Sequence, residues 1–312
     1  MTHKSSRAAC ALILGVMVSS PGAAESVKNG FQILDPLVPE ESILHGGPDR
    51  DGIPAILEPR FMMPADAHFL DRDDRVLGLS LNGISRAYPI KIMNYHEIVN
   101  DDVGGDPVVI SFCPLCGTGI AFHRSIDGEE RTFGVSGLLY NSDVLMYDHQ
   151  TESLWSQIAA MAISGESKGA RLRRIALLHT SWGDWRQRHP RTQVLSIATG
   201  YNRNYYRDPY AGYASSDRTF FPVAHSDDRL SAKEVVIGLE IDGRFKAYPF
   251  SELPSGENTI EDQHAGRELL IKYDLGSMSA RVIDSAGMEI PTFTAFWFAW
   301  VAFHPDTDVF SR

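Results

Sequence analysis

Short runs of alternating apolar and polar residues, separated by Gly, Pro, Asn and Asp, fill most of the chain after residue 75. Such runs predict short β-strands joined by turns. In Val76–Pro89, VLGLSLNGISRAYP, two of these runs flank Asn82 and Gly83. Asn-Gly is typical of a two-residue type I′ turn, because both turn positions need a positive φ. The pattern therefore predicts an antiparallel hairpin.

The same pattern returns at Val236–Pro249, VIGLEIDGRFKAYP, with seven of the fourteen positions identical. Unrelated segments of this length share about one identity, so we interpret the match as an internal duplication. Each copy continues into a second apolar run, Asp106–Phe112 or Arg267–Tyr273. We place the two copies at residues 76–122 and 236–282.

The region between the copies adds further strand patterns and one helix, expected at residues 180–190 with Thr180 or Ser181 as its N-cap and Pro190 at its end. The aromatic run at residues 293–303 is too short to span a bilayer and predicts a buried strand or core helix. The five tryptophans lie outside both aligned copies. The expected fold is β-rich α+β, with many short antiparallel strands, a duplicated hairpin-plus-strand unit and a few short helices.

The N-terminus has the three parts of a secretory signal. Lys4 and Arg7 precede an apolar run over residues 8–18, and small residues follow up to Ala24. We expect cleavage after Ala24, so residues 1–24 form the signal peptide and no transmembrane anchor remains. Residues 25–75, rich in Pro, Gly and Asp, predict an extended segment before the β-rich body at 76–312.

The net charge of the chain is −11 at neutral pH, without a cluster of Lys or Arg. This balance excludes nucleic acid and anionic membranes as expected partners. Together with the signal, it predicts a periplasmic or secreted protein whose partner is a small molecule or another exported protein.

The candidate chemistry lies in CPLCGTG, residues 113–119, whose Cys113 and Cys116 are the only cysteines beyond the signal. Pro114 stiffens the turn and Gly117 lets the backbone fold back, as in a metal-binding knuckle. A closed zinc site needs four ligands, so further ligands must come from elsewhere. A thiol-disulfide couple and an inert local disulfide remain alternatives.

Histidines supply the candidate further ligands. His96 follows the first hairpin, and its counterpart in the second copy is Gly256, so we expect His96 to join the cysteines. His304, after the aromatic run, is a possible fourth ligand. Copper or zinc suits thiolate and imidazole ligands. Gly117 stands where a haem-attachment motif has His, and no nucleotide-binding motif occurs.

Residues 137–148, GLLYNSDVLMYD, place polar side chains within an apolar run. Asn141 and Asp143 are candidates for a ligand pocket or for holding the metal ligands in place. The other interpretation is that they form a turn between strands. Asp148 and Trp155 carry the same two interpretations, since they flank a predicted hairpin turn.

Three long stretches, beginning HEIVNDD at His96, FGVSGLL at Phe133 and VLSIATG at Val194, resemble a prokaryotic family of unknown function, DUF 3179. The resemblance covers nearly all of the chain after the signal. It implies a shared fold and export, but no reaction. It places His96, both cysteines, Asn141, Asp143, Asp148 and Trp155 at motif positions, whereas His123 stands at a position where the family has another polar residue.

These observations lead to one main hypothesis and two rivals. The main hypothesis is an exported protein that binds copper or zinc through Cys113, Cys116 and His96, with His304 or an outside ligand completing the shell. The first rival is a periplasmic thiol-disulfide oxidoreductase that uses the same cysteines. The second is a non-catalytic binding module with an inert disulfide. Whether the protein is an enzyme is left open by the sequence.

Overall fold

The computed structural model of the chain describes residue 1 and residues 26–311, so the predicted signal peptide lies outside the described residues. The described part is β-rich and contains three short α-helices. They are α1 (Ile90–His96), α2 (Trp182–Arg188) and α3 (Trp297–Phe303). The predicted class of many short antiparallel strands with few helices is therefore confirmed.

Copy one contains two sheets. We call the first hairpin sheet 1; in spatial order it consists of β17 (Leu177–Ser181), β5 (Arg75–Leu81), β6 (Ile84–Pro89), β18 (Gln193–Leu195) and β4 (Phe61–Met62). The second, partner sheet 1, consists of β16 (Arg174–Ile175), β9 (Thr118–His123), β8 (Asp106–Cys113) and β7 (Ile98–Val103). The apolar faces of both sheets share one core.

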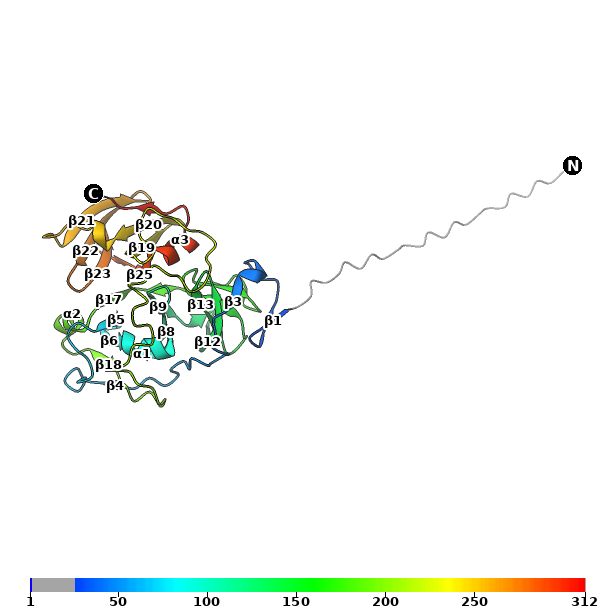
Figure 1. Cartoon of the computed structure of the whole chain (residues 1–312), viewed down its shortest axis with the longest axis horizontal. Coiled ribbons are helices and arrows are strands. Elements are labelled where there is room, and N and C mark those ends of the chain that lie inside the picture. The colour runs from blue at the N-terminus through cyan, green and yellow to red at the C-terminus, as the bar shows by residue number, and fades with distance from the viewer. Residues whose placement is uncertain (2–25, 312) are drawn as a thin grey trace.

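Copy two repeats this pair. Hairpin sheet 2 consists of β25 (Phe293–Phe296), β19 (Val235–Ile241), β20 (Arg244–Pro249) and β26 (Asp308–Val309). Partner sheet 2 consists of β21 (Thr259–His264), β22 (Arg267–Asp274), β23 (Ser279–Asp284) and β24 (Glu289–Ile290). Figure 1 shows this copy, in yellow to red, as a lobe above the rest of the molecule.

The predicted hairpins have the predicted turns. Asn82 and Gly83 have φ of 51° and 74°, and Asp242 and Gly243 have φ of 50° and 74°. Both turn residues are thus left-handed in each copy, as a type I′ turn requires. The β5–β6 and β19–β20 ladders are antiparallel and have the same register.

The duplication extends beyond the segments that align in sequence. In each copy an additional strand pairs with the hairpin, a seven-residue helix crosses it, and a short strand returns parallel to its second strand. Trp185 of α2 and Trp300 of α3 are equivalent, and each donates its indole N–H to a threonine hydroxyl at 2.9 Å, Thr192 or Thr307. Four of the five tryptophans thus belong to the duplicated unit.

This packing explains one of the shared glycines. A Cβ on Gly78 would lie 2.3 Å from the Trp185 ring, and one on Gly238 would lie 2.1 Å from the Trp300 ring. Real Cβ atoms do not approach so closely, so only glycine leaves room for the indole. The identical Gly at this position in the two hairpins follows from the tryptophan that covers it.

The fifth large sheet, the insert sheet, has no counterpart among the described sheets of copy two. It consists of β15 (Met161–Ser164), β14 (Leu154–Ser156), β13 (Asp143–Asp148), β12 (Phe133–Tyr140) and β3 (Ile43–His45). It packs against partner sheet 1 and hairpin sheet 2 around a core that includes Phe133 and Val236. Because β17 also packs on β23 and β25 packs on β9, the five sheets form a propeller-like ring.

Smaller elements complete the chain. The N-terminal segment carries β1 (Ser26–Lys28), β2 (Phe31–Ile33) and the short 3-10 helix η1 (Glu40–Ser42), while β10 (Ser125–Ile126), β11 (Glu129–Glu130) and η2 (Phe250–Glu252) lie at sheet connections. Residues 196–234 contain neither helix nor strand. We call them the roof segment, because they cover the site described below. Irregular segments of this length inside a compact domain often carry function.

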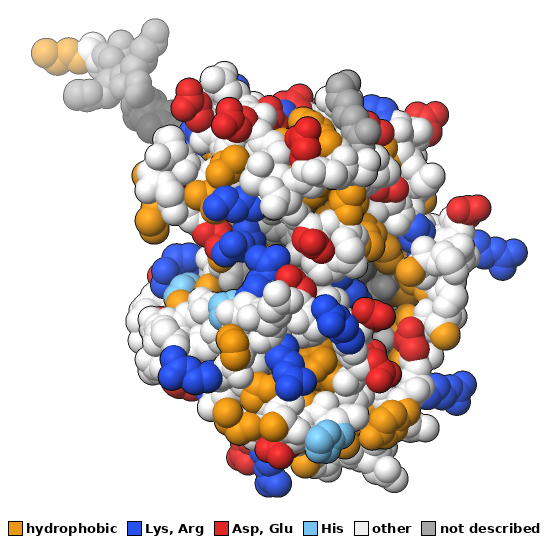
Figure 2. Space-filling view, turned by 90° about the vertical axis from the view of Figure 1, so that its left-hand side faces the viewer, with side chains coloured by type: hydrophobic (Ala, Val, Ile, Leu, Met, Phe, Trp, Pro, Cys, Tyr) orange, Lys and Arg blue, Asp and Glu red, His pale blue; other side chains and the backbone are white. Residues whose placement is uncertain are grey.

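Figure 2 shows Lys and Arg side chains gathered between the two lobes on one face of the molecule. A cavity of about 270 Å³ is lined by Arg188, Lys272 and Arg281, among other residues. Among the described residues, no helix combines the length and apolar character that crossing a bilayer requires.

Candidate metal centre

Two hairpin ends meet at the two cysteines. β8 ends at Cys113 and β9 begins at Thr118, which faces Cys113 across the ladder. Between them Gly117 adopts a φ of 62°, the left-handed conformation that closes the turn. The predicted strand and turn at CPLCGTG are confirmed, and the strand β9 follows the turn.

The second hairpin end is the turn between β12 and β13. Asn141 and Ser142 have φ of 53° and 63°, so a serine occupies a position that favours glycine. A left-handed non-glycine residue costs about 1–2 kcal/mol and persists where its surroundings hold it. Here the Ser142 carbonyl accepts from both thiols, at 3.7 Å from Cys113 Sγ and 3.3 Å from Cys116 Sγ.

Asp143, the first residue of β13, joins the two cysteines. The Sγ atoms of Cys113 and Cys116 and one carboxylate oxygen of Asp143 all lie within 4.8 Å of one another. Both sulfurs are enclosed, since Cys113 is 2% and Cys116 0% exposed, and Asp143 is 0% exposed. Tetrahedral zinc with bonds of about 2.0–2.3 Å holds its ligand atoms about 3.5 Å apart. Movements of roughly 1 Å would therefore bring this group to binding distance.

The Asp143 carboxyl is only partly satisfied. Its Oδ2 accepts from the Ile158 amide at 3.0 Å, but among the described residues no N–H or hydroxyl group donates to its Oδ1. Burial raises the pKa of Asp143 to about 8, and nearby backbone amides and the Cys113 thiol only partly offset this. A buried, unpaired carboxylate oxygen is costly unless a proton or a cation neutralises it.

A second buried carboxyl lies close by. Glu97 follows α1 and is 7% exposed; burial and then the charge of Asp143 raise its pKa to about 8. Burial also raises the pKa of the Cys116 thiol well above its usual value, and the neighbouring Cys113 adds to this effect. Without a cation, the site therefore favours the protonated forms of these groups near neutral pH.

One cation lies at the rim. The Lys233 ammonium sits 3.1 Å from the centroid of the Tyr213 ring, with the Phe296 and Phe298 rings at 5.2 and 5.4 Å. Burial lowers the pKa of Lys233 to about 8, against the opposing effect of Cys116. Burial, and after it the two neighbouring thiols, raise the pKa of the Tyr213 hydroxyl.

His96, the predicted third ligand, has both ring nitrogens engaged elsewhere. Nδ1 lies 2.7 Å from the Pro54 carbonyl, and Nε2 lies 2.7 Å from the Tyr205 hydroxyl of the roof segment. Neighbouring residues of α1 hold the same segment, since Tyr95 donates to the Arg207 carbonyl at 2.7 Å. His96 is fully buried but does not join the group formed by the cysteines and Asp143.

His304 lies in copy two. It stacks on Phe245 with ring centroids 3.9 Å apart, and burial lowers its pKa to about 3. Its equivalent in copy one, His189, lies 4.0 Å from the Trp185 ring. Both follow the duplicated helices and precede a proline, so His304 occupies a packing position of the repeat and is not part of the cysteine group.

Of the remaining candidates, one lies at the sulfurs and the others hold other parts of the fold. Asn141 anchors the roof segment, because its Oδ1 accepts from the Ala224 amide at 2.8 Å. Asp148 accepts from the Trp155 indole at 2.8 Å and from the Thr151 hydroxyl at 2.7 Å. Asp148 and Trp155 therefore close the β13–β14 hairpin, and only Asp143 of the four faces the sulfurs.

Glu97, Tyr213 and Lys233 were missed by the sequence reasoning. Glu97 directly follows His96, and the histidine is the more common metal ligand of the two. Tyr213 and Lys233 lie in the roof segment, which has no periodic pattern from which a position relative to the cysteines follows. The cue in the sequence was the length of this unpatterned stretch.

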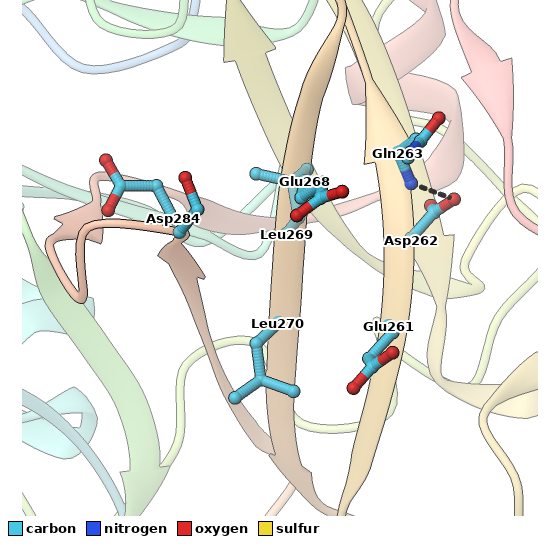
Figure 3. Close-up of a pocket in the computed structure, with 8 residues that line it drawn as sticks. Glu261, Asp262, Gln263, Glu268, Leu269, Leu270 and Asp284 are labelled. Atoms are coloured by element: carbon cyan, nitrogen blue, oxygen red, sulfur yellow. Dashed lines mark hydrogen bonds between the residues drawn. The ribbon is translucent and has the colours of Figure 1, made fainter.

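A second acidic feature lies on partner sheet 2. Glu261, Glu268 and Asp284 line a depression of about 510 Å³ on β21–β23. Figure 3 shows these side chains on three neighbouring strands. Glu261 and Glu268 are exposed to solvent and Asp284 is half-buried. No cysteine or histidine lines this depression, so it lacks the chemistry of the cysteine centre.

A family model described as "Protein of unknown function (DUF3179)" matches residues 50–288. The chain belongs to this family. The match includes both cysteines, Asp143, Glu97 and the whole roof segment. No curated protein and no solved structure matches the chain. The family match carries no reaction, so the function must be argued from the site itself.

Proposed function

We propose that this DUF3179 protein is an exported metal-binding protein that holds one zinc ion through Cys113, Cys116 and Asp143. The observation that carries the proposal is the Asp143 carboxyl, whose buried Oδ1 lacks an N–H or O–H donor and lies beside two thiols. A dication would replace the protons that Asp143 and Cys116 otherwise retain. This ligand set differs from the sequence-based hypothesis, because Asp143 takes the place of His96.

The donor types favour zinc over copper. Two thiolates suit both Zn²⁺ and Cu⁺, but a carboxylate is a hard ligand that suits Zn²⁺ better than Cu⁺. Calcium and magnesium require a shell of oxygen atoms, which two sulfurs exclude. Three protein ligands leave one position of a tetrahedral ion open, as in catalytic zinc sites. Bound zinc would act there as a Lewis acid on a fourth ligand.

Burial argues against the redox alternative. Thiol-disulfide exchange requires an accessible thiolate with a lowered pKa. Here both sulfurs are enclosed, and the pKa of Cys116 is raised by burial. Tyr213 and Lys233 of the roof segment also lie against the centre, so a protein disulfide has no open approach along that side.

Metal stoichiometry tests the proposal. The chain from residue 25, purified without metal, should bind one equivalent of zinc in a chelator competition, as measured by mass spectrometry of the intact complex. Cys116→Ser should bind none at the same free zinc concentration. Ser277→Ala changes the equivalent position of copy two and is the matched control, which should bind like the unmodified chain.

Other outcomes would overturn the assignment. Stoichiometric Cu⁺ binding without zinc binding would identify copper as the metal. A folded protein that binds neither metal and forms mixed disulfides in Cys116→Ser would favour the oxidoreductase. Export is tested separately, since the mature N-terminus should be Glu25 when the full chain is recovered from periplasmic extract.

A further inference from the structure

A cavity of about 370 Å³ lies between the insert sheet, the N-terminal segment and the roof segment. Most of its lining is apolar, including Ile53, Leu139 and Phe221. Volumes of this order are typical of pockets for small organic molecules. The cavity therefore has the size and the surface of a ligand pocket.

The cavity adjoins the cysteine centre. Leu115, between the two cysteines, and Val144, next to Asp143, both line it. Tyr210 of the roof segment forms another part of the wall; burial, and then the neighbouring Glu97 and Cys113, raise its pKa. A molecule in the cavity would thus lie next to the cysteine centre.

Glu97 is the one charged side chain in this lining. It is 7% exposed, and among the described residues its carboxyl makes neither a hydrogen bond nor an ion pair. A buried carboxyl without a partner in an apolar cavity is unfavourable unless a ligand satisfies it. A cation is the ligand that best satisfies an ionised carboxylate, because the hydrogen bond between them is charge-assisted.

We infer that this cavity binds a small apolar amine, with the hydrocarbon part against Leu139 and Phe221 and the ammonium group paired with Glu97. The inference extends the proposed zinc site by naming the class of molecule that lies beside it. It needs the cavity and Glu97, and it does not need bound zinc.

Binding has a proton signature. In the empty cavity at pH 7 the Glu97 carboxyl is largely protonated, because burial raises its pKa to about 8. An alkylamine carries its charge at this pH, much as Lys does. Pairing with the ammonium group requires the Glu97 carboxylate, so binding releases the carboxyl proton to solvent. Amine affinity should therefore rise as the pH increases towards about 8.

Octylamine, octanol and octanoate test the inference, because they have hydrocarbon tails of similar length and differ in the head group. Isothermal calorimetry on the folded chain, with and without zinc, should rank octylamine at least about tenfold tighter than octanol and octanoate weakest. Calorimetry in buffers of different ionisation enthalpy should show the release of one proton for octylamine. Glu97→Gln should abolish both the amine preference and the proton release while octanol binding persists.

Cavity variants test the location. Leu139→Trp fills the cavity and should remove binding of all three molecules, whereas Leu37→Trp changes an exposed leucine and should change nothing. If Leu139→Trp does not fold, Phe220→Ala opens the wall at an exposed residue and should weaken all three.

Equal binding of the three molecules, or an unchanged amine preference in Glu97→Gln, would overturn the inference. Failure of zinc binding alone would not overturn it, because binding of the three molecules is also measured on the zinc-free protein. Conversely, zinc binding without any octylamine binding would leave the zinc proposal intact and refute the amine site.

Discussion

The turn between β8 and β9 and the turn between β22 and β23 are equivalent in the two copies, but their side chains make different hydrogen bonds. In copy two, Asp274 Oδ1 accepts from the Ser277 amide at 2.6 Å and from its hydroxyl at 2.7 Å. In copy one, Cys113 and Cys116 occupy these two positions and instead approach the Ser142 carbonyl. The turn closes in both cases, so the thiols are not required for its shape.

The surroundings of the two turns differ more than their backbones. Gly117 and Met278, the equivalent left-handed residues, have φ of 62° and 45°. Asp274 and Met278 are exposed, whereas the cysteine turn is covered by the insert sheet and by the roof segment. Copy two has no counterpart of either element. The site therefore lies where additional chain encloses one of two similar turns.

The largest expected effect concerns stability that depends on zinc. At a free zinc concentration about 1,000 times the dissociation constant, binding should stabilise the protein by about 4 kcal/mol. In the double variant Cys113→Ser and Cys116→Ser this gain should vanish, because no thiolate remains. Thermal unfolding with and without zinc measures the effect.

The converse exchange serves as its control. Asp274→Cys with Ser277→Cys puts both thiols into copy two, where no carboxylate corresponds to Asp143 and the turn is exposed. The zinc stoichiometry should stay at one. A second tightly bound ion would show that the enclosure does not matter.

A smaller effect is expected for Asp143→Asn, which keeps the size of the side chain and removes its charge. Zinc affinity should fall by at least about 10–100-fold, the loss typical of removing a supporting group from a metal site. Competition with a chelator measures it. Asp148→Asn is the comparison variant, because Asp148 closes a hairpin, and an equal loss of affinity there would contradict a direct role for Asp143.

The pH dependence of stability should reveal the two buried carboxyls. Their pKa values are about 8 in the folded protein, compared with ordinary values of 3.8 for Asp143 and 4.5 for Glu97. The folded state therefore retains protons that the unfolded state releases. The free energy of unfolding of the zinc-free protein should fall from about pH 4 to about pH 8, by up to about 1.4 kcal/mol per pH unit for each carboxyl.

Urea unfolding across this range measures that slope. Asp143→Asn and Glu97→Gln should each flatten it, and zinc should remove the contribution of Asp143, because the bound carboxylate is already ionised. A slope that is the same in all three proteins would mean that neither carboxyl is protonated in the folded state.

The smallest effect on metal binding is expected for His96→Leu, since the imidazole anchors the roof segment. Zinc affinity should change by less than about tenfold, while the loss of the bonds to Tyr205 and Pro54 should cost about 1–3 kcal/mol of stability. Faster proteolysis within residues 196–234 would report the loosened segment, with His225→Leu, an exposed histidine of that segment, as control. Complete loss of zinc in His96→Leu would restore His96 as a ligand.

Local signals made much of the fold predictable. Alternation of apolar residues around Asn82-Gly83 and Asp242-Gly243 predicts the hairpins, and Ser181 caps α2 by accepting from the Asp184 amide, as expected. The second half of the duplication escaped notice because it is separated from the first by the insert sheet in one copy. Its shared Trp, His, Pro and Thr positions lie outside the aligned segments.

The strands, the turns, the position of the two cysteines at the end of a strand, and the family were predictable from the sequence. These features depend on neighbouring residues, whose spacing a single chain displays. Three features became visible in the folded protein: Asp143 lies beside the sulfurs, His96 holds the roof segment, and Glu97 faces an apolar cavity. Contacts between residues far apart in the chain depend on how sheets pack, and that packing is set by the whole core and not by local pattern.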